Sequence, residues 1–144
     1  MERPAGEWYS SLPRAGDIYR LIDSASAGRD RDERIRAVIA LGATEDPRAV
    51  RPLISCCRDP DPAIRGCATA ALGKLRSGRA VPVLTEQMRD RNEEQQIRDH
   101  AALSLAGIRS AEAVRALEDF ARDPGEDPGI RSRVREMLDR LEHG

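Results

Sequence analysis

The sequence is poor in the residues on which most catalytic and metal sites depend. It contains four aromatic residues, two histidines and three cysteines in 144 residues. With so few histidines, one of them beside the last residue, we expect neither a His-rich metal site nor a Ser-His-Asp triad. The scattered aromatic residues offer no row on which nucleic-acid bases could stack. We therefore predict no metal, no cofactor, no catalytic residue and no enzymatic activity.

The cysteines and the apolar segments limit where the protein is expected to work. Cys56, Cys57 and Cys67 are odd in number and have no C-x-x-C spacing, so they predict neither a disulfide framework nor a zinc site. Small buried thiols in a reducing compartment are expected instead. The N-terminal residues carry no apolar signal region, and no segment reaches the roughly 20 apolar residues of a membrane span. The prediction is a cytoplasmic protein without a membrane segment.

Charge is abundant but balanced, with 24 basic and 25 acidic residues and a net charge of −1. Lys74 is the only lysine. This balance argues against a broad nucleic-acid footprint. A weak nucleic-acid binder remains an alternative because of the arginine content, which is locally high near the C-terminus at Arg131, Arg133, Arg135 and Arg140. Acidic residues alternate with these arginines, which favours a solvated terminal face.

What the chain does contain is a repeat with a period of 31 to 33 residues. An acidic residue is followed four positions later by arginine in four pairs, namely Asp30 with Arg34, Asp61 with Arg65, Glu94 with Arg98, and Asp127 with Arg131. Leu41, Leu72, Leu105 and Leu138 recur at the same interval. A fixed period of this length indicates a stack of similar units rather than a single irregular domain.

Each unit has the pattern of two helices joined by a polar turn. Apolar residues at i, i+3 and i+7, as in Val50, Leu53 and Cys57, predict one amphipathic helix, and a second apolar stripe follows the turn. Asp-Pro pairs at 46–47, 61–62 and 127–128 are helix starts, with an N-cap acceptor before a proline. Gly42, Gly73 and Gly107 either end helices or permit close helix contact. The predicted pairs are 17–27 with 31–43, 47–58 with 62–76, 78–90 with 94–108, and 111–122 with 128–142.

These segments resemble a known family. The stretches 61–65, 71–73 and 79–84, which read DPAIR, ALG and RAVPVL, are similar to HEAT repeats of the short type found in phycobilisome lyases. The resemblance covers about residues 16–144 and implies an all-α fold, a right-handed α-α superhelix of about four helix pairs. The expected repeats are about 16–44, 45–76, 77–109 and 110–144. Some relatives are iron hydroxylases with His-Glu ligand pairs, but His100 is followed by Ala101 and His143 by Gly144.

The acid and arginine pairs have a structural interpretation. An acid at the start of a helix stabilises the helix dipole, and arginine four residues later has the right order for an intrahelical ion pair. The family resemblance implies in addition that these acids and arginines form a ladder between adjacent repeats. The expected ladder residues are Asp30, Arg34, Asp61, Arg65, Glu94, Arg98, Asp127 and Arg131.

A partner surface is expected where the second helices of the pairs line the concave side. The residues proposed for it are Ile35, Ile39, Ala70, Asp99 and Leu103. Their apolar members form either inter-repeat core or a groove for a partner. At the N-terminal end, residues 1–15 are predicted to fold over the first repeat as a hydrophobic lid, with self-association as the competing interpretation.

The function predicted from these features is a protein-interaction scaffold that binds an unidentified protein partner on its concave face. Fold alone does not decide function, so two alternatives stay open. One is an accessory subunit of a lyase-like enzyme of the bilin type, which would require a second chain. The other is the weak nucleic-acid binder described above.

Overall fold

The computed structural model describes residues 15–143, all of whose regular elements are helical. The helices are α1 (Ala15–Ala27), α2 (Arg31–Ala43), α3 (Val50–Cys56), α4 (Pro62–Leu75), α5 (Val81–Arg89), α6 (Gln95–Ile108), α7 (Ala111–Arg122) and α8 (Pro128–His143). Short 3-10 turns, η2 (Pro47–Ala49) and η3 (Gly78–Ala80), lead into α3 and α5. Residues 1–14 lie outside the described residues, so the lid and the self-association of this segment stay predictions.

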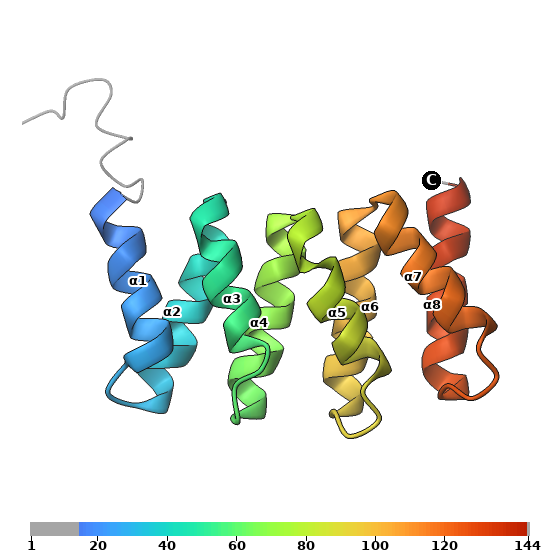
Figure 1. The fold of residues 1–144 in the computed structure, drawn as a ribbon, viewed down its shortest axis with the longest axis horizontal. Helices are drawn as coiled ribbons and strands as arrows, with labels where there is room; N and C mark the ends of the chain where they lie inside the picture. Colours follow the sequence, from blue (N-terminus) through green and yellow to red (C-terminus); the bar gives the residue numbers. More distant parts are fainter. Residues whose placement is uncertain (1–14, 144) are drawn as a thin grey trace, which may run out of the picture.

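The helices form two rows, as Figure 1 shows: α1, α3, α5 and α7 make the first, and α2, α4, α6 and α8 the second. Each first-row helix packs against the second-row helix that follows it, and α2, α4 and α6 pack against one another in sequence. The predicted all-α solenoid of stacked helix pairs is confirmed. Because each pair contacts chiefly its neighbours, the core is a continuous layer between the rows.

The core consists of the two apolar stripes of each pair. Leu41, Leu72 and Leu105 are fully buried, and their equivalent Leu138 in α8 is half-buried. Phe120 is among the largest side chains with no exposed surface. Adjacent repeats therefore bury the leucine series, whereas the helix at the end of the stack has a neighbour on one side.

Helix starts follow the predicted N-caps. Asp61 accepts a hydrogen bond from the backbone N–H of Ala63, and Asp127 accepts one from Ile130. Asp46 does the same for Arg48 at the 3-10 turn η2. In each case a carboxylate oxygen satisfies an N–H group that has no partner within the helix, and the following proline needs none.

Helix ends in the second row are not made by glycine. The left-handed residues that follow the helices are Glu45 (φ 56°), Arg76 (φ 51°) and Arg109 (φ 59°), at equivalent places in three repeats. Gly42 and Gly73 lie inside helices, where an added Cβ would stand 2.6 Å from the Cβ of Ala71 and 2.5 Å from the Oγ of Ser104. Of the two roles that the sequence left open, these two glycines permit close contact between second-row helices.

Replacing Gly42 by alanine is expected to lower the free energy of unfolding by about 1–3 kcal/mol, because the new methyl group meets the backbone of α4. Gly107→Ala is the matched control: its nearest contact would be 3.9 Å away, so the better helix propensity of alanine should stabilise by up to about 1 kcal/mol. Urea unfolding of both variants measures the difference. Equal effects of the two changes would contradict the close-packing role.

Candidate functional site

Arginine bridges join each described repeat to the next at the turn end of the helix pairs. Arg34 of α2 contacts the carboxylate of Asp59, which lies in the turn of the following pair. Arg65 of α4 reaches Glu93 at 2.9 Å, and Arg98 of α6 reaches Glu126 at 3.1 Å. Arg34 and Arg98 also donate to backbone carbonyl oxygens of the first helix in their own pair. Arg34 and Arg98 thus each connect both helices of their own pair with the turn of the next pair.

The acids in these bridges are not the ones predicted. Asp30, Asp61 and Asp127 accept hydrogen bonds from backbone N–H groups at the starts of their own helices. Of these three acids, Asp61 also forms an ion pair with the preceding repeat, through Arg31 at 2.6 Å. Glu94 makes no such side-chain cap and is exposed. The physical reason is reach: the short N-cap carboxylate turns toward its own helix end, while the long arginine extends past it into the next turn.

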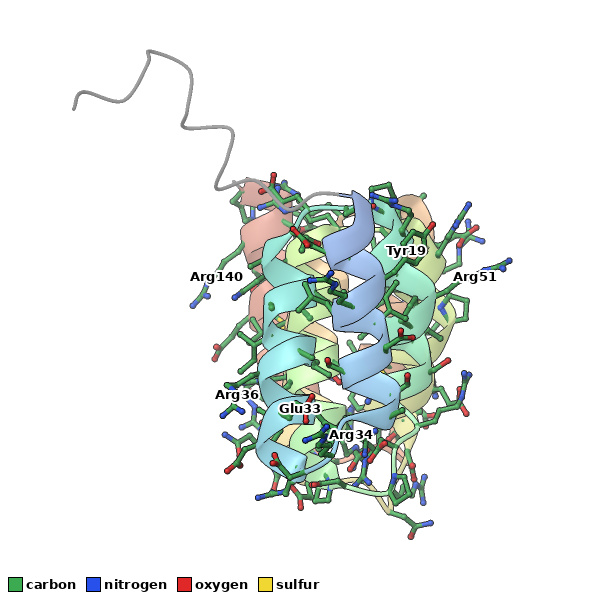
Figure 2. The ribbon with its side chains drawn as sticks, turned by 90° about the vertical axis from the view of Figure 1, so that its left-hand side faces the viewer. Tyr19, Glu33, Arg34, Arg36, Arg51 and Arg140 are labelled. Carbon is green, nitrogen blue, oxygen red and sulfur yellow. The ribbon has the colours of Figure 1, made fainter. Side chains whose placement is uncertain are left out.

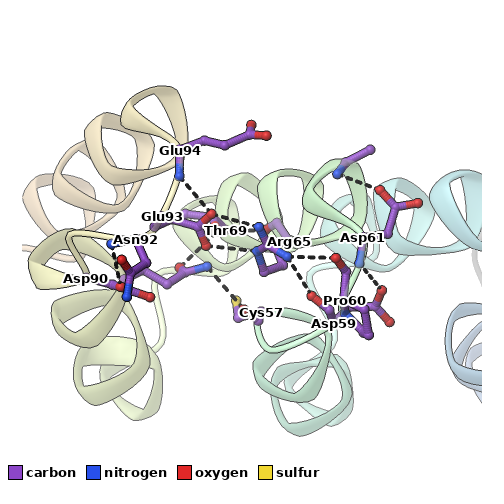
Figure 3. A network of polar contacts seen from close by, with 12 residues as sticks. Cys57, Asp59, Pro60, Asp61, Arg65, Thr69, Asp90, Asn92, Glu93 and Glu94 are labelled. Atoms are coloured by element: carbon purple, nitrogen blue, oxygen red, sulfur yellow. Dashed lines mark hydrogen bonds and ion pairs between the residues drawn. The ribbon is translucent and has the colours of Figure 1, made fainter.

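The bridge between the second and third repeats is part of a larger network, seen in Figure 3. Arg65 donates through two nitrogens to both oxygens of Glu93, each at 2.9 Å, and through its third nitrogen to the carbonyl oxygens of Asp59 and Pro60. Its hydrogen bond to Glu93 is the main cause that raises the pKa of Arg65. The glutamate side chain is only 5% exposed. This bidentate ion pair with a buried carboxylate fixes the register of the repeats.

A second contact in the same network lies deeper. Thr69 donates to the amide oxygen of Gln87 at 2.9 Å, and the amide nitrogen of Gln87 donates to the carbonyl oxygen of Cys57 at 3.4 Å. No buried side-chain nitrogen or oxygen among the described residues lacks a hydrogen-bond partner. The polar groups at this end are therefore used to hold the stack.

In α8 the arginines also make internal contacts. Arg131 and Arg135 donate to the carbonyl oxygen of Ala121 at 3.4 and 3.2 Å, and Arg133 pairs with Asp99 of α6 at 2.9 Å. Among residues 15–143 Arg131 has no carboxylate partner of the kind its three equivalents have. Asp99, proposed for a partner surface, is engaged in this bridge.

The helices of the second row, α2, α4, α6 and α8, have a side that faces away from the first row. We call this side the B-helix face, and it carries exposed apolar side chains. Ile39 is 51% exposed and Leu103 is 53% exposed. The remaining large apolar side chain with comparable exposure in the described chain is Tyr19 of α1, which lies on the other side together with Arg51, away from Arg36 and Arg140 (Figure 2). The exposed aliphatic side chains are therefore gathered on one face.

Two adjoining hollows run along the B-helix face and share Ala70. The first, about 500 Å³, is lined by small residues and charged ones, including Gly42, Gly73, Gly107, Leu103, Lys74 and Arg76. The second, about 520 Å³, is lined on the other side of Ala70 by residues including Pro62, Gly66, Cys67, Ile97 and His100. Gly42 and Gly73, at which the second-row helices come into close contact, are part of the lining of the first hollow.

The structure separates the residues that were predicted for partner binding. Ala70 and Leu103 line the hollows, and Ile39 is exposed on the same face. Ile35 is partly buried and packs against the core. The sequence did not indicate Lys74 and Arg76 as part of this surface, because both stand in the last turn of a predicted helix, where a basic residue is ordinary.

The cysteines differ in exposure. Cys56 and Cys57 are buried, and burial is the main cause that raises both pKa values, that of Cys57 to about 12. Cys67 is half-buried at the second hollow, and burial, followed by the charge of Asp61, raises its pKa. No thiol is therefore activated as a nucleophile by its surroundings, since a raised pKa reduces the thiolate fraction.

Within 15–143, no three His, Cys, Asp or Glu side chains are grouped so that they could hold a metal ion. In the same part of the chain, every helix is too short or too polar to cross a membrane.

Comparison with known proteins identifies relatives of this architecture. The HEAT-repeat family matches residues 18–95. A phycocyanobilin lyase subunit alpha from Synechococcus elongatus is 41% identical over 69 residues, which make up 46% of this chain and 25% of that protein. The chain thus spans a quarter of the length of this relative. The predicted resemblance to HEAT-like repeats of the phycobilisome lyase type is confirmed.

Solved structures have the same fold. Human deoxyhypusine hydroxylase in complex with glycerol superposes with a TM-score of 0.77 at 26% identity, over 89% of this chain and 44% of the hydroxylase. The complex of CpcE and CpcF of phycocyanin lyase from Nostoc sp. PCC7120 matches with a TM-score of 0.67 at 22% identity, over 92% of this chain and 57% of that one. The prediction that the chain is not an enzyme was wrong, because its relatives include a lyase subunit and a hydroxylase.

Replacing Arg65 by methionine, which keeps most of its volume, should lower the free energy of unfolding by about 3 kcal/mol, because Glu93 is left as a buried carboxylate without its arginine. Arg58→Met is the control: the Arg58–Glu86 pair is 59% and 65% exposed, so its loss should cost less than about 1 kcal/mol. Denaturant titration gives both values. A small effect at Arg65 would contradict its role in joining the repeats.

Thiol titration of the native protein should distinguish the cysteines. At pH 8 we expect a disulfide reagent to modify Cys67 slowly and to leave Cys56 and Cys57 unmodified, because their raised pKa values and burial keep them as protonated thiols. The rate at Cys67 should rise about tenfold per pH unit up to its raised pKa. Unfolding should release three equivalent thiols. Rapid reaction of all three in the native state would contradict the burial.

Proposed function

The chain belongs to the HEAT-repeat family, and we propose that it serves as a subunit of a lyase-like enzyme, in which the B-helix face receives a bilin and a second chain completes the assembly. The observation that carries the proposal is the pair of adjoining hollows beside exposed Ile39 and Leu103. Each is within the 300–1,000 Å³ typical of small-molecule sites.

The shape and chemistry of the B-helix face support an elongated ligand with an apolar body and polar groups. A bilin is an open-chain tetrapyrrole with a long conjugated surface, and the transfer of this surface from water into an apolar site is favourable. The first hollow has a floor of glycine, and the second adds Pro62 and Ile97. A long ligand can therefore cross α4 at Ala70, which is exposed and has only a methyl group.

The proposal of a second chain rests on the relatives. One is named as the alpha subunit of a phycocyanobilin lyase, and another comes from a complex of CpcE with CpcF. The present chain spans 25% and 57% of these proteins, respectively, so the activity of the assembly is part of the proposal. The free cysteines support a reducing compartment such as the cytoplasm as the proposed location.

Titration with phycocyanobilin, followed by its visible absorbance, tests the proposal. The wild-type protein should change the spectrum saturably. Leu103→Asp should weaken binding at least tenfold, because a charge replaces an apolar contact worth about 1.5 kcal/mol or more. The change should leave the fold intact, since Leu103 is 53% exposed.

The matched control is Tyr19→Asp, which places the same charge at an equally exposed apolar residue on the other side of the molecule. It should bind the bilin as the wild type does. Circular dichroism verifies that both variants remain helical. The absence of any spectral change with the wild type would reject the proposed function, and equal weakening by both variants would move the site away from the B-helix face.

A further inference from the structure

Two cations stand at one end of the first hollow without an internal partner. Lys74, the only lysine of the chain, and Arg76 both line this hollow and are exposed. Neither side chain forms a hydrogen bond or ion pair with any residue between 15 and 143. By contrast, Arg31, which lines the second hollow, is bound to Asp61 at 2.6 Å. Lys74 and Arg76 therefore keep their donors available for a ligand.

The backbone holds Arg76 in an unusual conformation at the rim. Its φ is 51°, in the left-handed region, and its N–H donates to the carbonyl oxygen of Leu72 at 3.2 Å. A side chain in this conformation costs about 1–2 kcal/mol relative to the right-handed one, and glycine would avoid that cost. Arg109 has the same conformation one repeat later but does not line the hollow. The two arginines therefore differ in position and not in local geometry.

The surroundings combine positive charge with apolar surface. Glu45 is the one carboxylate that lines the first hollow; it follows α2, whereas Lys74 and Arg76 belong to the end of α4. The cations thus outnumber the acid in a hollow whose remaining lining is small or apolar, such as Gly73 and Leu103. An elongated ligand with an apolar body and carboxylates at one edge would match both parts of the lining.

We propose that Lys74 and Arg76 bind the propionate groups of a bilin whose tetrapyrrole body lies along the hollows past Ala70 and Leu103. This inference rests on the proposed function and identifies the polar end of the same site. Arginine can hold a carboxylate with two parallel hydrogen bonds, and lysine adds a mobile point charge. The pair would fix the direction in which the ligand lies on the B-helix face.

The first experiment compares phycocyanobilin with its dimethyl ester, which keeps the tetrapyrrole and removes both negative charges. The wild type should bind the free acid about tenfold more tightly than the ester. Lys74→Gln and Arg76→Gln should each reduce that preference at least threefold and leave ester binding unchanged. Arg109→Gln is the matched control, because it removes an exposed arginine from the same backbone conformation, and it should keep the preference.

Because the chain has a single lysine, a second measurement can be made on the wild-type protein. Acetylation of Lys74 can be followed by mass spectrometry, with the α-amino group of the chain as an internal reference. Saturating phycocyanobilin should slow the modification of Lys74 at least fivefold relative to the α-amino group, and the dimethyl ester should slow it less. Because this test needs no substitution, it is independent of any effect of a variant on folding.

The outcomes separate this inference from the proposed function. If acid and ester bind with equal affinity and Lys74 is not protected, the carboxylate site is rejected while bilin binding stands. If neither compound binds, the proposed function is rejected together with the inference. Preference for the acid that persists in both Lys74→Gln and Arg76→Gln would also reject these residues as the carboxylate site.

Discussion

The arrangement of this molecule depends on the contact between one helix pair and the next. At the turn end, Arg34, Arg65 and Arg98 each reach a carboxylate of the following pair. At the other end, Gly42 and Gly73 let successive second-row helices touch. One end is fixed by ion pairs, and the other by van der Waals contact together with the hydrogen bond from Ser104 to the carbonyl oxygen of Thr69.

The first hollow lies beside the same contacts. Gly42 and Gly73 line it together with Ala70 and Leu103. The polar network at the turn end is internally satisfied, whereas Lys74 and Arg76 at the other end are not bound to the described chain. Lys74 and Arg76 therefore mark the polar end of the proposed bilin site, at the end of α4.

The relatives show that proteins with different activities share this architecture. A lyase subunit and a hydroxylase have this architecture, and the described part of the present chain has no group of residues suited to hold a metal. Function in such folds depends on the side chains displayed by the helices rather than on the stack. In the function proposed for this chain, those side chains are the apolar and cationic ones on the B-helix face.

The repeat, the helix pairs and most helix boundaries could be predicted from the sequence, because apolar spacing and N-cap residues such as Asp61 act within a few residues along the chain. It also indicated Ile39, Ala70 and Leu103 as members of one surface. That Arg65 meets Glu93 rather than Glu94 depends on how the next turn is oriented, which no local pattern in the sequence specifies. Likewise, the proposal that Lys74 and Arg76 form a site depends on the stacking that places the end of α4 beside Leu103 of α6. Local patterns set the elements, and contacts between distant residues set the partners.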